Sequence, residues 1–404
     1  MATKSILSRK VGILALSTLS MISLTTSPSY AAIAQAFHAG NTFVQMLTSI
    51  PNLAALIAGL VIGRLAAGRM PHKYLAITGV ALICLGGLAP LVYHASLSFL
   101  LVCSAVIGFG QGMVTNIVQV LITEELPENQ RQDVMGKNTA FTNFGAMLVI
   151  FAGGVLAAKS WVNNYLAYLF PVLILIIVLI ALPLHKSEAV ENVQTKNSPV
   201  EKTKISVNKF TWLIALGGFC SMVLYNVFSN NISLFVTAHH LGGSALAGGL
   251  SMIGLLGGLL CGIIVGSLAK VLKNYTISSS FLLMALSFLI IGFANSMIMI
   301  GVGSFLSGAA LSLCMAQYPY LISISADKTS VPMSIGVYSA GLAIGGFASP
   351  FLMNILAGSD TSALNIFTTS GLASLVLCIL IAAIGLQRKI VEQAFGQSGK
   401  TENA

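Results

Sequence analysis

The stretch GRLAAGRMPHK, at residues 63–73, separates two long apolar runs with positive charges, a proline and two glycines. A weaker copy, GSLAKVLK, follows at residues 266–273. Small residues spaced four apart precede each copy, and this spacing places them on one helix face, where another helix can pack closely in lipid. They are Ala55, Gly59 and Gly63 before the first copy, and Gly254, Gly258, Gly262 and Gly266 before the second. The repeat predicts a chain of two similar halves.

The composition is that of a membrane protein. Of the 404 residues, 56% are hydrophobic and only 8% are charged, whereas soluble proteins carry about 25% charged residues. The six cysteines lie within apolar runs without metal-ligand spacing, which indicates small buried hydrophobes. We therefore expect no disulfide framework, no metal site and no cofactor. The sequence contains no G-x-x-x-x-G-K-[ST] motif, which argues against an ATP-driven pump in this chain.

Twelve apolar runs are long enough to span a bilayer, which takes about 20 residues per helix. The first six predict a bundle over residues 1–184, and the second six predict another over residues 209–386. Polar residues 185–208 form the expected linker, and residues 387–404 form a polar, mobile tail. The runs lie at roughly 11–34, 42–66, 74–94, 98–122, 135–157, 163–184, 209–237, 243–268, 276–294, 297–324, 332–356 and 363–386.

The positions of Lys and Arg indicate the orientation, because these residues accumulate in cytoplasmic loops. With the N-terminus inside, all of them except Lys159 lie on the cytoplasmic side. We therefore expect a protein of the inner cell membrane with both termini cytoplasmic. This topology accounts for the net charge of +9 without a nucleic-acid partner. The basic N-terminus also fits a signal peptide cleaved near Ser29-Tyr30-Ala31, but further apolar runs follow, so an uncleaved first span is favoured.

A constant offset of 200 residues relates the later spans of the two halves. It pairs Gly108 with Gly308, Gly136 with Gly336 and Gly145 with Gly345. Each half has six spans, so both halves begin inside and are parallel repeats, an arrangement in which two bundles enclose a central site. The sequence therefore predicts an all-α integral membrane protein of twelve transmembrane helices in two six-helix bundles.

The loop at residues 63–73 resembles a motif of the major facilitator superfamily, G-x-L-A-D-R-x-G-R-K, between spans two and three. Gly63, Leu65 and Ala66 match it, Arg69 and Lys73 add basic residues beyond, and Arg131 lies in a similar loop before span five. The resemblance covers nearly all of the chain and implies that these residues act in gating. The family's Asp is replaced by Ala67. Because that Asp belongs to a charge network latching the two halves, we expect the latch to be weakened or built differently.

No Asp or Glu lies in the middle of a span, since all eleven fall in loops, tails or span ends. An intramembrane ion is costly and usually functional, and a proton-coupled carrier normally uses such a carboxylate as its titrating group. We infer that the substrate is neutral or lipophilic, or that coupling uses groups near the gates.

Polar stripes in the spans are the remaining candidates for substrate contacts. In span one, Ser20, Ser23, Ser27 and Tyr30 have the spacing of one helical face. An amide or hydroxyl facing lipid is costly, so these groups face protein or a wet cavity. The resemblance implies a cavity lined by spans one, four, seven and ten; the alternative is hydrogen bonding that only holds the bundle together. The candidates are Ser27, Tyr30, Asn116, Gln119, Tyr225, Asn226, Asn230, Gln317 and Tyr318.

The glycine stripes have two interpretations, as passive packing surfaces or as close contacts between helices that slide during transport. The glycines concerned are Gly59, Gly254, Gly258, Gly262, Gly266, Gly341 and Gly345.

The resulting functional hypothesis is a secondary carrier that works by alternating access and exports a small, neutral or lipophilic solute. Resemblance to efflux permeases favours this direction, and uptake of a neutral solute such as a sugar is the alternative. The expected partners are the bilayer, the substrate and protons as coupling ion, and we expect a monomer. A membrane enzyme is disfavoured because the spans contain no paired carboxylates, metal cluster or nucleophile–base arrangement. A sensor is disfavoured because the linker and the tail are too short for the soluble domain that we would expect of one.

Overall fold

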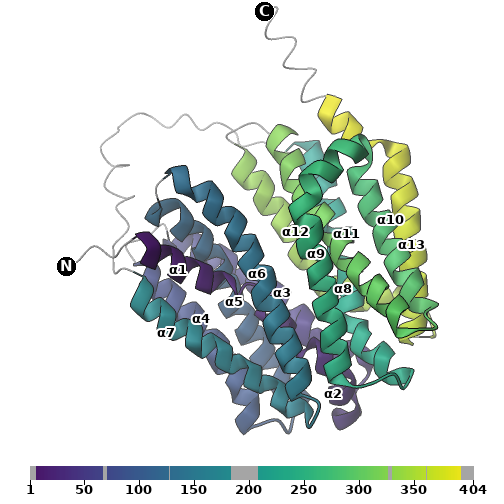
Figure 1. The fold of residues 1–404 in the computed structure, drawn as a ribbon, viewed down its shortest axis with the longest axis horizontal. Coiled ribbons are helices and arrows are strands. Elements are labelled where there is room, and N and C mark those ends of the chain that lie inside the picture. Colours follow the sequence, from purple (N-terminus) through teal and green to yellow (C-terminus); the bar gives the residue numbers. More distant parts are fainter. Residues whose placement is uncertain are drawn as a thin grey trace, which may run out of the picture. The chain divides into compact units, whose positions relative to one another are not determined.

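A computed structural model describes residues 6–66, 71–126, 128–182, 208–325, 330–360 and 362–392 of the chain. Side chains are not described at positions 60, 62–66, 123–125, 128–133, 135–136, 323 and 331–332. Within these ranges all regular secondary structure is helical (Figure 1). The contacts divide the chain into two compact units, called here unit 1 and unit 2. Unit 1 contains α1 to α7 and the first turns of α9, and unit 2 contains α8, the rest of α9 and α10 to α13.

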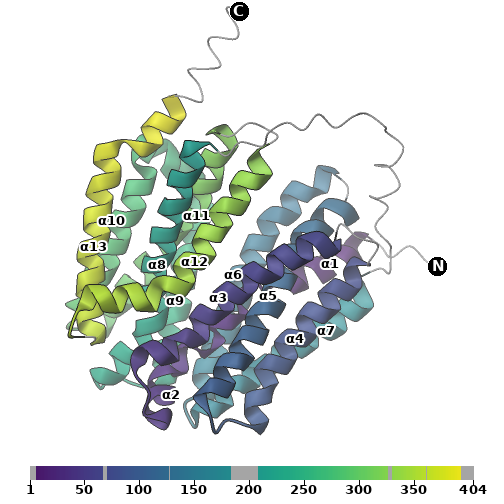
Figure 2. The same ribbon diagram turned by 180° about the vertical axis from the view of Figure 1, so that it is seen from behind.

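The first span of unit 1 is interrupted by a 3₁₀ segment, and its last span begins as a 3₁₀ helix. Its long regular helices lie between these two. In chain order the elements are α1 (Ile6–Ser17), the 3₁₀ helix η1 (Ile22–Ser29), α2 (Tyr30–Phe37), α3 (Asn41–Ala66), α4 (His72–Val92), α5 (Leu97–Glu125), α6 (Glu128–Leu156), the 3₁₀ helix η2 (Trp161–Tyr168) and α7 (Leu169–Ala181). Helices α4 and α7 lie side by side in both views (Figure 2).

Unit 2 is built from α-helices that, unlike the first span of unit 1, are not interrupted by a 3₁₀ segment. They are α8 (Lys209–Ala238), α9 (Ser244–Leu272), α10 (Thr276–Gly292), α11 (Met297–Ser325), α12 (Val331–Ala357) and α13 (Ala363–Ile384), with the short 3₁₀ turn η4 (Lys273–Tyr275) between α9 and α10. Helices α10 and α13 run side by side (Figures 1 and 2).

The helices have the length and composition of membrane spans. In the described ranges, eleven continuous helical stretches are long and apolar enough to cross a membrane. One of them, Ser244–Gly292, has 49 residues; as a single straight helix it would be about 73 Å long, more than twice the hydrocarbon core of a bilayer. Lys273, with φ 48°, turns the chain there and separates α9 from α10. Counted as two, these helices complete twelve spans and confirm the predicted fold class.

The predicted first span, at roughly residues 11–34, lies within the continuous helical stretch Ile6–Phe37, but it is not a regular α-helix, because α1 ends at Ser17 and η1 follows. Pro28 lies inside η1 and has no N–H for an α-helical hydrogen bond. The hydroxyls of Thr25 and Ser27 donate to carbonyls three residues back, at 2.6 Å to Ile22 O and 2.8 Å to Leu24 O. Such bonds compete with the backbone hydrogen bonds of an α-helix. The serine stripe predicted in this span therefore does not follow a single α-helical face.

The prediction of a mobile tail from residue 387 onward is also wrong for its first residues. Gly385, with φ 61°, ends α13 in the left-handed conformation, and residues 386–392 form a further helical segment. The Gln387 amide donates to Lys273 O at 2.8 Å and accepts from the Ile277 N–H at 3.3 Å. This buried side chain fastens the segment to the connection between α9 and α10.

Glycines at the 200-residue offset occupy equivalent helix crossings in the two units. The backbone of Gly108 lies against Pro51 in unit 1, and that of Gly308 lies against Gly254 in unit 2. Likewise, Gly145 lies against Thr18 and Gly345 against Phe219. A side chain at any of these four glycines would meet neighbouring backbone, so these two pairs mark positions where two helices approach closely. The third pair differs, because a Cβ at Gly336 would meet nothing within 4 Å.

Candidate functional site

A group of buried, uncharged polar side chains lies in unit 1 where η1 and α2 approach η2. We call Thr26, Ser29, Tyr30, Asn164 and Tyr165 the hydroxyl cluster. Its two sides are joined directly, because the Asn164 amide donates to the carbonyl of Thr25 at 2.9 Å. The Tyr30 hydroxyl lies near that of Thr26, although not in hydrogen-bonding geometry. The rings of Tyr165 and Tyr168 stack with centroids 6.1 Å apart.

The cluster holds polar atoms without a hydrogen-bond partner among the described residues. They are Thr26 Oγ1, Ser29 Oγ, Tyr30 Oη, Asn164 Oδ1 and Tyr165 Oη. All five residues are buried, with at most 2% of their surface exposed. An unpaired buried polar group costs about 1–3 kcal/mol. The cluster therefore combines unsatisfied hydrogen-bond donors and acceptors, among the described residues, with the absence of formal charge.

Of the two residues predicted in the first span, the structure places only Tyr30 in this cluster. Ser27 is equally buried, but its hydroxyl donates to the backbone carbonyl of Leu24, three residues back. Sequence reasoning missed Thr26 and Ser29 because it assumed an α-helical period. It also missed Asn164 and Tyr165, whose signal was a pair of polar residues opening an otherwise apolar run.

The predicted amides of α5 lie outside the core of unit 1. Asn116 and Gln119 are both exposed. The Asn116 amide donates to the carbonyl of Gly112, four residues back, at 2.8 Å. The same amide nitrogen would lie 3.0 Å from a Cβ added at Gly59 on α3. Asn116 therefore contributes to the packing of α3 against α5.

In unit 2, the predicted residues on α8 are all buried but differ in their hydrogen bonds. Asn226 donates to Met222 O at 2.8 Å, and neighbouring Asn231 donates to Val227 O at 2.9 Å. Asn230 is 1% exposed, and neither its amide nitrogen nor its amide oxygen has a partner among the described residues. Tyr225 is 7% exposed. Asn230 is therefore the member of this group with most capacity for a ligand.

The predicted pair on α11 belongs to the interior of unit 2. Tyr318 is fully buried, and its hydroxyl lies 3.4 Å from Ser221 Oγ on α8. Ser221 also donates to Cys314 Sγ at 3.3 Å, and Cys314 lies 2.7 Å from Ser280 Oγ on α10. Gln317 is buried beside Tyr318. These contacts join α8, α10 and α11, as expected if the polar stripe only holds the bundle together.

The loop motif is described only in part. Gly63, Leu65 and Ala66 form the last turn of α3, Arg131 lies on α6 without a described side chain, and Arg69 lies outside the described residues. Lys73 is buried, and its amine donates to Leu179 O at 2.6 Å and Leu182 O at 2.9 Å. In the structure Lys73 thus caps the C-terminal end of α7, where a cation is favourable. A gating role was predicted for it instead.

The predicted packing glycines contact helices of their own unit. A Cβ at Gly254 would lie 3.1 Å from Ser304 O, at Gly258 3.2 Å from Gly308 O, and at Gly262 3.0 Å from Ser312 Oγ. On α12, a Cβ added at Gly341 would lie 2.6 Å from the Ala215 carbonyl of α8 and one at Gly345 would lie 2.5 Å from that of Phe219, whereas a Cβ at Gly266 would meet nothing within 4 Å. These contacts fit close packing within a bundle.

A different glycine pair joins helices from the two halves of the sequence. A Cβ at Gly154 on α6 would lie 2.6 Å from Ser244 O and 3.1 Å from the backbone of Gly248, both on the first turns of α9. All three residues lie in unit 1. At this contact, unlike at the predicted stripes, a helix of the first half meets one of the second half at backbone distance.

Comparison with known proteins agrees with this architecture. The sequence model of the Major Facilitator Superfamily matches residues 12–277, and no curated protein sequence matches the chain. The nucleoside transporter NupG is similar in structure, with a TM-score of 0.74 and 12% identity over 93% of this chain and 99% of that one.

Two further solved structures share the fold. A transporter of the POT family in complex with a thioalcohol-conjugated peptide has a TM-score of 0.72 and 14% identity over 94% of this chain and 96% of that one. An inward-facing bacterial homologue of the human lysosomal transporter Spinster has a TM-score of 0.70 and 14% identity over 97% and 99%. Since the family's model matches well over half of the sequence, this chain belongs to the major facilitator superfamily of membrane transporters.

Proposed function

We propose that this protein is a secondary carrier that exports a small uncharged, lipophilic solute across the inner cell membrane by alternating access. Residues 1–184 and 209–386 act as the two moving bundles, residues 185–208 link them, and both termini are cytoplasmic. The observation that supports this proposal most is the chemistry of the hydroxyl cluster and Asn230, which combine polar atoms that have no partner in the described part of the chain with the absence of formal charge.

The substrate class follows from the cost of burying charge. A charged solute entering a low-dielectric span needs a counter-charge, because an unpaired buried ion is far more costly than an unpaired hydroxyl. All eleven carboxylates of the sequence lie in loops, tails or span ends. A neutral solute instead gains hydrogen bonds from Tyr30, Tyr165 or Asn230 without introducing a charge.

Export is favoured by the resemblance of the sequence to efflux permeases, with protons as the coupling ion. Since the spans contain no carboxylate, proton coupling would use groups near their ends. The second candidate is uptake of a neutral polar solute such as a sugar. Asn230 favours this alternative because its amide can both donate and accept, as recognition of a hydroxyl requires. The structural similarity to the nucleoside transporter NupG fits the same alternative.

The test is accumulation of a neutral lipophilic fluorescent dye in everted membrane vesicles under an imposed proton gradient. Ser29→Ala and Asn230→Leu should each lower the initial rate about tenfold, corresponding to loss of a hydrogen bond of about 1.4 kcal/mol. Ser17→Ala is the matched control, because that buried hydroxyl donates to the Ile13 carbonyl within α1 and lies outside the hydroxyl cluster. Loss of accumulation in all three variants alike would contradict the assignment. Labelled-sugar uptake without dye accumulation would favour the second candidate.

A further inference from the structure

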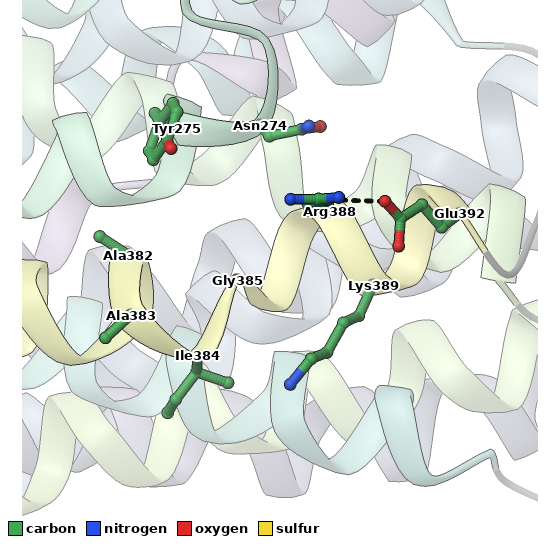
Figure 3. Close-up of a pocket in the computed structure, with 9 residues that line it drawn as sticks. All are labelled: Asn274, Tyr275, Ala382, Ala383, Ile384, Gly385, Arg388, Lys389 and Glu392. Carbon is green, nitrogen blue, oxygen red and sulfur yellow. Dashed lines mark hydrogen bonds and ion pairs between the residues drawn. The ribbon is translucent and has the colours of Figure 1, made fainter.

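A basic pocket lies at the end of unit 2 where η4 meets the end of α13 and the helical segment 386–392. Its volume is about 440 Å³. Figure 3 shows Asn274 and Tyr275 from the connection between α9 and α10, together with Arg388, Lys389 and Glu392 from the segment that follows α13. The distribution of Lys and Arg in the sequence assigns this end of the bundle to the cytoplasmic side.

The walls of the pocket are held together by contacts that do not depend on a ligand. Gly385 turns the chain after α13, and its N–H donates to Ile381 O and Ala382 O at 3.2 Å each. Leu386 and Ile390 are buried, at 9% and 0% exposure. The buried Gln387 amide bonds to Lys273 O and to the Ile277 N–H. The segment is therefore anchored by its buried face, and its other face carries the charged side chains.

The charged rim of the pocket is suited to an anion. Arg388 and Lys389 are the two cations that line it, and Glu392 is the only carboxylate among the lining residues that the structure describes. Arg388 Nε donates to Glu392 Oε1 at 2.6 Å. A guanidinium has five N–H donors and binds phosphate through two of them at once. Arg388 can therefore keep its bond to Glu392 and still receive a phosphate.

The remaining wall is apolar, and this feature distinguishes between possible anions. Ala382, Ala383 and Ile384 line the pocket below the basic rim. Ile384 is 53% exposed, and Ile379 on the turn before it is 60% exposed. In a membrane-spanning helix, such side chains face the acyl chains of lipids. Tyr275, 61% exposed, has the amphipathic character that places tyrosines at the membrane–water interface.

We propose that this pocket binds an anionic phospholipid of the surrounding leaflet, with Arg388 contacting the head-group phosphate, Lys389 adding positive charge to the rim, and the apolar wall contacting the start of the acyl chains. The order of apolar wall and basic rim along the pocket matches the order of acyl chain and phosphate in a phospholipid. The volume lies in the range of small-molecule sites, about 300–1,000 Å³. A free phosphate would use the rim and leave the apolar wall without a partner.

The test is native mass spectrometry of the purified full chain with phosphatidylglycerol titrated into the detergent. Arg388→Gln should weaken the most tightly retained lipid about tenfold, as expected for a charge-assisted hydrogen bond. Glu392→Gln should strengthen retention about threefold, because it removes a competing carboxylate. Lys209→Gln is the matched control: it removes the same charge at the start of α8, where Lys209 lies over the Phe210 ring and does not line the pocket.

Three comparisons decide the outcome. Phosphatidylcholine, which has no net charge, should be retained less than phosphatidylglycerol, and inorganic phosphate at equal concentration should not displace the lipid. Equal losses in Arg388→Gln and Lys209→Gln would overturn the proposal, as would displacement by inorganic phosphate. The opposite signs predicted for Arg388→Gln and Glu392→Gln guard against a general folding defect, which would weaken retention in both variants.

Discussion

The first helix of unit 1 and its counterpart α8 in unit 2 occupy equivalent places in the repeat but have different structures. Each packs against a glycine at the 200-residue offset, Gly145 in one unit and Gly345 in the other. Helix α8 continues without interruption over Lys209–Ala238, whereas the first helix ends at Ser17 and resumes at Tyr30 after a 3₁₀ segment. The repeat therefore conserves the helix crossing while the local sequence decides the backbone between crossings.

The two regions also differ in how they satisfy their polar groups. On α8, Asn226 and Asn231 return their amides to carbonyls four residues back, which leaves Asn230 as the unsatisfied member. In unit 1 the interruption releases several atoms at once, including Thr26 Oγ1 and Tyr30 Oη. On a regular helix, a polar side chain can bond to a carbonyl one turn back, whereas the interruption leaves several polar atoms of unit 1 unsatisfied among the described residues.

The largest expected effect on stability comes from placing a proline in α8 at the position equivalent to that of Pro28. Thr18 and Phe219 are the equivalent positions at the shared helix crossing. The same spacing between the two units pairs Pro28 with Ser229, which is buried within α8. Ser229→Pro should lower the free energy of unfolding by about 3 kcal/mol or more, because proline inside a helix removes one hydrogen bond and clashes with the preceding turn. Thermal unfolding of the purified protein measures this loss. A stable Ser229→Pro variant would show that α8 tolerates the interruption and that the two regions are interchangeable.

The shared helix crossing can be tested by filling it in each unit. Gly145→Leu and Gly345→Leu should each cost about 3 kcal/mol, at the upper end for overpacking, because the added side chain meets backbone in both cases. Gly336→Leu is the control, since Gly336 is exposed and has no neighbour within 4 Å. The measurement is the melting temperature of each variant. Similar losses in the control would mean that the effect comes from the leucine itself.

The sequence predicted the repeat register that pairs Gly145 with Gly345, and close packing at Gly345, but not the interruption, for a physical reason. Where two backbones touch, only glycine fits, so the close approach of the helices is visible in the sequence as Gly145 and Gly345. Pro28 was also visible, but a proline is tolerated in many membrane helices without ending them. The deciding contribution came from the Thr25 and Ser27 hydroxyls bonding to carbonyls three residues back, which depends on their rotamers. Tyr30 was found because it continues the helical spacing of Ser20, Ser23 and Ser27, although that spacing assumed a regular α-helix, and Asn164 was missed because its partner is 139 residues away.

Lys73 shows a similar limit. Its place in a basic loop motif predicted a gating role, whereas the structure gives its amine two carbonyl partners at the end of α7. A motif records residue types along the chain and cannot show which distant helix end a lysine reaches.

Tyrosine hydroxyls provide a smaller test of the difference between the two units. Tyr318→Phe should cost about 1 kcal/mol, because its hydroxyl lies within 3.4 Å of Ser221 Oγ. Tyr30→Phe should leave stability unchanged or slightly higher, because the Tyr30 hydroxyl has no partner among the described residues. Transport should show the reverse pattern, with a loss in Tyr30→Phe and little change in Tyr318→Phe. If melting temperatures fall equally in both variants, the Tyr30 hydroxyl is held by the protein and is not available to a ligand.

The smallest expected change in stability comes from removing the proline where it occurs naturally. Pro28→Ala restores a backbone N–H, but the Leu24 carbonyl four residues back already accepts the Ser27 hydroxyl at 2.8 Å, so the gain should stay within about 1 kcal/mol. Transport should nevertheless fall, because any shift of η1 toward a regular helix rotates Thr26 and Ser29 away from Asn164 and Tyr165. Melting temperature and transport rate measured on one preparation separate the two effects. Unchanged transport with unchanged stability would show that the hydroxyls alone hold the interruption, and Thr25→Val would then be the variant that closes it.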